Sequence, residues 1–249
     1  MTFIVKYANI YIEVIMKNIE NYEVINKAIA LVSEHMKEDK SGHGMEHIMR
    51  VYNIAMKIAE TEKCDKTLVA LGSILHDCDD YKLFGEESQK GLVNTRRILN
   101  QIEVDEKTKD AVIDIVKTIG YKKRLNGIVP NTIEGMIVSD ADMCEAVGVH
   151  GILRTHQYTL LHGHPFFDKD IFPITDMDAN KYSRDCSDTA VCHLFEKGLK
   201  LKKLMLTNSG KIEAEKRHNI TVDFLKALFE EEEAPEWTEY LSDFLKEKI

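Results

Sequence analysis

Histidine and aspartate residues occur in three groups whose side chains could bind a metal ion. The groups are His43 with His47, the pair His76-Asp77, and Asp140 with Asp142. Imidazole nitrogen and carboxylate oxygen together suit Mn, Fe, Ni, Co, Zn and, less well, Mg. A bound dication lowers the pKa of its water and offsets charge on a phosphoryl group, so such a site favours hydrolysis.

Helices are expected to position these groups. The four prolines all lie at or after Pro130, so the first half of the chain lacks this helix breaker. Apolar residues recur at helical spacing over residues 24–32, 48–58, 68–75, 92–102, 112–119 and 133–147. Asn131, three residues before Glu134, is typical of an N-cap, which would start that helix near Thr132. The pattern predicts an all-α fold.

The last third of the chain begins with an irregular stretch. Residues 162–187 contain two prolines and many polar residues, which predicts a long loop. Leucines from Leu194 to Leu206 predict one helix, a longer helix is expected from Gly210 to Glu232, and a short last helix should follow.

The composition limits the class of protein. Hydrophobic residues make up 44% of the 249 residues and charged residues 30%, which is typical of a folded globular chain. A net charge of −9 argues against nucleic acid and anionic membranes as partners. Five cysteines without a C-x-x-C pair favour a reducing compartment. The apolar start lacks a cleavage site and is too short to span a bilayer, so we expect a cytoplasmic protein.

The three groups stand in longer motifs that resemble a known family. GHGMEHIMRVYNIA, ILHDCDDYK and IVSDADMCEAVGVHGILRT, in this order, resemble the HD superfamily of metal-dependent phosphohydrolases. With FEKGLKLKKLMLTNSGKIEAEKRH, they resemble its small single-domain bacterial subgroup called YedJ/YpgQ-like. The resemblance covers roughly residues 22–230.

The resemblance, with the absence of a linker or repeat, predicts one compact HD-type helical domain over residues 1–249. Its expected parts are an N-terminal extension at residues 1–20, an HD core at about 22–165, and C-terminal helices at about 188–248. An alternative native start at Met16 would place most of the extension outside the natural protein.

The resemblance also implies roles for individual residues. The metal ligands of the family fall on His47, His76, Asp77 and Asp142. The acidic residue that positions or activates the attacking water falls on Asp80, our candidate general base. A helix-end carboxylate without a catalytic role is the alternative for Asp80.

Two neighbours compete with these ligands. His43 lies four residues before His47 and could share its helix face, so it is either the ligand or a contact close to the metal. Asp140 and Asp142 cannot share a helix face, and the family register selects Asp142. Asp140 is then an orienting residue or a cap.

Phosphate recognition requires cationic donors near the site. The candidates are Arg50, Lys82, Lys122 and Arg154, although Arg50 could instead pair with an internal carboxylate.

The function implied is hydrolysis of a small phosphorylated metabolite, most simply a nucleotide, with release of phosphate or pyrophosphate. No histidine occurs from Cys78 to Val149, where dinuclear members of the superfamily place additional ligands, so one divalent metal ion is expected. Two alternatives are a metal-stabilised module that binds or senses a nucleotide without turnover, and a diiron oxygenase.

Overall fold

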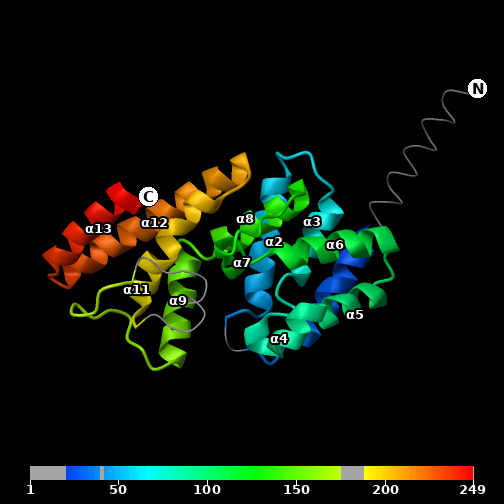
Figure 1. Ribbon diagram of the computed structural model, residues 1–249, viewed down its shortest axis with the longest axis horizontal. Coiled ribbons are helices and arrows are strands. Elements are labelled where there is room, and N and C mark those ends of the chain that lie inside the picture. Colours follow the sequence, from blue (N-terminus) through cyan, green and yellow to red (C-terminus); the bar gives the residue numbers. More distant parts are fainter. Residues whose placement is uncertain (1–20, 40–41, 175–187, 249) are drawn as a thin grey trace, which may run out of the picture.

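The computed structural model describes residues 21–39, 42–174 and 188–248 (Figure 1). The expected N-terminal extension, the start at Met16 and part of the long loop lie outside these residues. Every regular element in the described ranges is a helix, which confirms the all-α prediction. The division of the chain into one HD-type domain stays a prediction.

The helices follow one another closely along the chain. A first helix covers residues 21–35. The others are α2 (Met45–Ala59), α3 (Lys66–Leu75), α4 (Tyr81–Gly91), α5 (Val93–Gln101), α6 (Glu106–Thr118), α7 (Tyr121–Leu125), α8 (Ile133–Glu145), α9 (Val149–Leu161), α11 (Ala190–Glu196), the 3-10 helix η1 (Gly198–Leu204), α12 (Asn208–Glu231) and α13 (Pro235–Lys248). In Figure 1, α2 to α6 gather on one side and α11 to α13 on the other, with α7 and α8 between them.

Helix α8 packs against both α2 and α3, and these three helices carry the expected ligands. Their contact is apolar, with Val51 of α2 and Ile137 and Ala141 of α8 fully buried. The packing is close: a Cβ on Gly72 of α3 would lie only 3.3 Å from a side-chain carbon of Val138 on α8. Such close packing leaves the backbones little freedom to shift, so the side chains at the helix ends are held in place.

A second apolar core lies under α9, α11, α12 and α13. It is rich in aromatic rings: Trp237 is fully buried, stacks on Phe172 with 4.5 Å between ring centroids, and contacts Phe229 at 5.4 Å. The Trp237 indole N–H donates to Lys169 O at 3.1 Å. The indole N–H of this core is therefore satisfied within the protein.

Two helix boundaries differ from the sequence prediction. The N-cap of α8 is Thr132 and not Asn131, because Thr132 Oγ1 accepts the backbone N–H of Gly135. Glu134 does not close a capping box, because its carboxylate accepts the backbone N–H of Asp65. The expected helix from Leu194 to Leu206 is wrong: the backbone breaks at Lys197, with φ −128° and ψ −62°, between α11 and η1.

The expected helix from Gly210 to Glu232 corresponds to α12, and the last helix to α13. Residues 164–174, within the expected loop, contain no regular helix. Over the described ranges, no helix has both the length and the apolar character needed to cross a bilayer.

Candidate metal centre

Four side chains from three parts of the fold converge on one point. His47 lies on α2, His76 and Asp77 directly follow α3, and Asp142 lies on α8. The Nε2 atoms of His47 and His76 are 3.1 Å apart. Asp77 Oδ2 lies 3.3 Å from His47 Nε2 and 3.4 Å from His76 Nε2, and Asp142 Oδ1 lies 3.8 Å from each nitrogen. These are the four residues predicted as ligands.

The neighbours of the two Nδ1 atoms determine which nitrogen of each neutral imidazole carries the proton. His76 Nδ1 lies 2.7 Å from Ser73 O, a carbonyl that can only accept, so Nδ1 of His76 carries the proton. His47 Nδ1 lies 2.9 Å from Glu145 Oε2, off the line of an ideal hydrogen bond, and a proton on this nitrogen is favoured by the carboxylate. Both Nε2 atoms then present lone pairs to the same point.

This convergence fits a cation. Two nitrogen lone pairs and two carboxylate oxygens repel one another unless a positive charge lies between them. The donor set of two imidazoles and two carboxylates suits a divalent transition metal. His47, His76 and Asp142 form one group of side chains able to hold a metal ion, and His43, His47 and Asp77 form an overlapping one.

The shifted pKa values of His76 and Asp77 also indicate that positive charge is stabilised at this position. Burial alone would lower the pKa of His76, but the carboxylates of Asp77 and Asp142 outweigh burial and raise it to about 9. Burial alone would raise the pKa of Asp77, yet His76 and His43 hold it well below its usual range. The cluster takes up a proton where a metal ion would bind.

Glu145 contacts a proposed metal ligand, and the sequence prediction did not single it out. Its side chain is fully buried and contacts three basic groups: His47, Arg50 through Nε at 2.8 Å, and Arg154. Burial would raise the pKa of Glu145, but these partners lower it to about 2. Its position one helical turn after Asp142 was the available signal, because residues at i and i+3 share a helix face.

His43 and Asp140 occupy different surroundings. His43 Nδ1 lies 2.8 Å from Asp77 Oδ2, so this histidine stands at the edge of the centre. Asp140 is fully buried and accepts the backbone N–H groups of Leu206 and Thr207 and the hydroxyl of Thr207. It anchors the start of α12, because its position on α8 points it away from Asp142.

Comparisons with known proteins agree with this arrangement. The family model of the HD domain matches residues 44–147. A crystal structure of an HD-superfamily hydrolase from Bacillus thuringiensis is 31% identical, with a TM-score of 0.66, and the match covers 86% of this chain and 99% of that one. The chain belongs to the HD superfamily.

Other similar proteins match most of the chain. A crystal structure from Lactobacillus plantarum is 28% identical, has a TM-score of 0.73, and is matched over 84% of this chain and 97% of that one. YpgQ of Bacillus subtilis (strain 168) is 28% identical over 217 residues, which are 86% of this chain and 94% of YpgQ. A crystal structure of YpgQ in complex with ADP superposes with a TM-score of 0.66, over 85% of this chain and 96% of that one. The resemblance to this superfamily and subgroup is confirmed.

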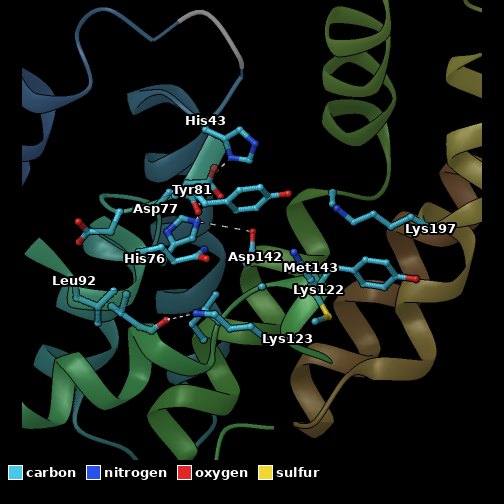
Figure 2. Close-up of a pocket in the computed structure, with 18 of the residues that line it drawn as sticks. His43, His76, Asp77, Tyr81, Leu92, Lys122, Lys123, Asp142, Met143 and Lys197 are labelled. Atoms are coloured by element: carbon cyan, nitrogen blue, oxygen red, sulfur yellow. Dashed lines mark hydrogen bonds and ion pairs between the residues drawn. The ribbon is translucent and has the colours of Figure 1, made fainter. Parts of the chain in front are cut away.

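The HD centre opens into a cavity of about 160 Å³ (Figure 2). The wall of the cavity includes His76, Asp77 and Asp142, together with His43, Asp80, Tyr81, Lys122, Lys123, Arg154 and Lys197. Asp80 precedes α4, and its backbone carbonyl accepts the N–H groups of Leu83 and Phe84 at the start of that helix. The carboxyl-bearing residue proposed from the HD motif is therefore on the cavity wall.

The predicted phosphate contacts are not equivalent in the HD fold. Arg154 lines the cavity, but its guanidinium contacts Glu145 and donates to Gly42 O at 2.9 Å. Arg50 pairs with Glu145, as the alternative of an internal carboxylate partner predicted, and it is not among the described residues lining the cavity.

The two predicted lysines also differ. The Lys122 ammonium lies 5.2 Å from the centroid of the Tyr81 ring. The side chain of Lys82, on α4, lies outside the described part of the structure. The roles of all four in substrate binding stay predictions.

Proposed function

We propose that this protein is a metal-dependent phosphohydrolase that acts on a small phosphorylated metabolite, a nucleotide in the first instance. The observation that carries the proposal is the pair of Nε2 atoms 3.1 Å apart, with two carboxylates alongside, while His76 Nδ1 bonds to Ser73 O and His47 Nδ1 lies 2.9 Å from Glu145 Oε2. His76, Asp77 and Asp142 of this arrangement line a cavity whose wall also contains basic side chains.

One divalent cation would be held by His47, His76, Asp77 and Asp142. When bound, it supplies Lewis-acid chemistry, which lowers the pKa of water and offsets negative charge on a phosphoryl group. Ser73 and Glu145 hold the two imidazoles in the tautomer that leaves Nε2 able to donate its lone pair. Such support is typical of histidine ligands.

Asp80 is the proposed general base. It lies on the wall of the cavity that the ligand carboxylates line, next to Tyr81 at the start of α4. A carboxylate there can accept the proton that the attacking water loses as it bonds to phosphorus. The leaving oxygen departs with the remaining phosphate chain or alcohol.

The nucleotide assignment is supported by YpgQ, which has been crystallised in complex with ADP. ADP offers a phosphoanhydride and a phosphate ester. Both bonds can be hydrolysed by the chemistry described above, so the substrate class is set by which phosphorylated compound fits the cavity.

The test is a screen of metal-stripped protein reloaded with Mn, Ni, Co, Fe, Zn or Mg. Nucleoside mono-, di- and triphosphates are incubated with each form, and phosphate and pyrophosphate are measured separately. We expect turnover with at least one transition metal. No turnover of any nucleotide with any metal would overturn the nucleotide assignment.

Asp80→Asn is the variant that separates catalysis from binding. We expect it to retain one metal ion per chain by elemental analysis and to lose turnover. Tight nucleotide binding by wild-type protein without any turnover would favour a sensing module instead. Two irons per chain would favour an oxygenase.

A further inference from the structure

Lys123 differs from the other basic residues of the cavity wall. It lies on α7, the helix that begins directly after Gly120. The φ of +122° at Gly120 turns the chain back from the end of α6. Its Nζ donates to Val116 O at 3.1 Å, a carbonyl in the last turn of α6. That bond uses one of three N–H groups on the ammonium and leaves two without an acceptor among the residues that the structure describes.

The surroundings of Lys123 are acidic and partly dry. Burial lowers the pKa of Lys123, while the carboxylates of Asp77, Asp80 and Asp142 act in the opposite direction. In the view of Figure 2, Lys123 and His43 lie on opposite sides of His76 and Asp142. The ammonium therefore borders the metal centre from the side that His43 does not occupy.

Metal binding would change this charge balance. Two of the three carboxylates that offset Lys123 are the proposed metal ligands, and a dication would take up their charge. Of these three carboxylates, Asp80 alone would then remain as a counter-charge to the half-buried ammonium, and an anion in the cavity would become favourable. Binding of the metal ion would thus favour binding of an anionic ligand in the cavity.

We propose that Lys123 is the residue that binds a phosphate oxygen of the substrate, with the two N–H groups that Val116 does not use. The inference rests on the proposed function, because it presupposes a phosphorylated substrate. Arg154 is less suited, since Glu145 and Gly42 O already engage its guanidinium.

The experiment measures ADP binding by calorimetry to the full chain loaded with Mn²⁺. Lys123→Met should weaken ADP binding by roughly ten- to hundredfold, the effect of losing a hydrogen bond to a charged group. Lys123→Arg should recover part of the loss. Lys117→Met is the matched control, because Lys117 is an exposed lysine of α6 that pairs with exposed Asp114, and the ADP affinity of this variant should equal that of wild type.

Mn²⁺ affinity provides the second measurement. Removing a positive charge beside the ligand carboxylates should leave Mn²⁺ binding equal or tighter in Lys123→Met. A variant that binds Mn²⁺ more tightly but ADP as wild type does would show Lys123 to be only a counter-charge, and would overturn the inference. If Lys123→Met does not fold by circular dichroism, Lys123→Gln, which can still donate to Val116 O, takes its place.

Failure of the proposed function would look different. Wild-type protein that binds neither ADP nor orthophosphate in the presence of Mn²⁺ would overturn both proposals. Wild-type binding with no loss in Lys123→Met would overturn this inference alone.

Discussion

The two sides of the molecule bury polar groups in opposite ways. The HD side, from α2 to α8, buries His47, His76 and Glu145 beside an apolar core, and its two Nε2 atoms lie 3.1 Å apart beside two carboxylates. The side formed by α9 and α11 to α13 buries mainly aromatic rings around Trp237, whose one N–H has an acceptor.

We expect this difference to separate the part of the fold whose stability depends on a metal ion from the part whose stability does not. The HD side has an electrostatic conflict that a cation removes, so its stability should depend on metal. The core of the aromatic side is apolar, and the indole N–H of its Trp237 has an acceptor in Lys169 O. The two sides meet where Asp140 of α8 accepts the N–H groups of Leu206 and Thr207, and where Arg154 of α9 contacts Glu145.

The largest expected effect is on the HD side. Asp77→Asn should remove a ligand and reduce turnover by about a thousandfold or more, because the cation would lose an anionic oxygen. Elemental analysis should show loss of the metal ion, with a melting temperature near that of metal-free wild type. Asp114→Asn, at an exposed aspartate of α6, is the control. Full activity with bound metal in Asp77→Asn would contradict the ligand assignment.

On the aromatic side, Trp237→Ala should lower the free energy of unfolding by about 3–5 kcal/mol, because it leaves a large cavity in a closely packed core. Below its melting temperature, this variant should bind Mn²⁺ within about twofold of wild type, a near-unchanged affinity because Trp237 touches none of the proposed ligands. Urea unfolding and Mn²⁺ titration measure the two quantities. A parallel loss of Mn²⁺ affinity would show that the two sides are not independent.

Glu145→Gln tests whether the contact of Glu145 with His47 Nδ1 supports metal binding by His47. The amide keeps the shape but removes the charge beside His47 Nδ1, so Mn²⁺ affinity should fall by about 10- to 100-fold. Glu213→Gln is a matched control: Glu213 of α12 also pairs with two basic residues, Lys57 and Arg217, away from the proposed ligands. Equal Mn²⁺ affinity in both variants would contradict a role for Glu145 in supporting the metal site.

The last prediction compares one histidine from each side in metal-free protein. The pKa of His76 is raised to about 9, so its contribution to stability is complete below pH 6.5 and is lost as the pH rises through 9. Burial lowers the pKa of His218 on α12 to about 4, so stability is lost as the pH falls from 6.5 toward 4. Each slope is at most about 1.4 kcal/mol per pH unit.

Urea unfolding at pH 5, 7 and 9 measures both slopes. His76→Gln should flatten the alkaline side only and His218→Gln the acid side only. Bound metal should abolish the alkaline loss, because it requires neutral His76. Identical pH profiles for the two variants would contradict the difference between the sides.

Much of this fold could be predicted because apolar spacing and helix breakers act locally. The helix boundaries that were predicted wrongly depend on contacts with residues far away in the sequence. Thr132 and not Asn131 caps α8 while Glu134 binds the N–H of Asp65, a residue of another segment. The break at Lys197 interrupts a leucine pattern that looks continuous, because α11 and η1 pack on different neighbours.

By itself, the sequence determined the helical class and the residue types of the metal centre, because spacing and side-chain chemistry are local properties. Only the tertiary structure decided which nitrogens face the metal position, since Ser73 O and Glu145 are what hold the protons on the far side of each ring. It also made Glu145 a partner of Arg50 and Arg154 and brought Lys123 to the centre from another helix. These assignments depend on packing of α2, α3, α7, α8 and α9, and that packing sets the direction in which each side chain points.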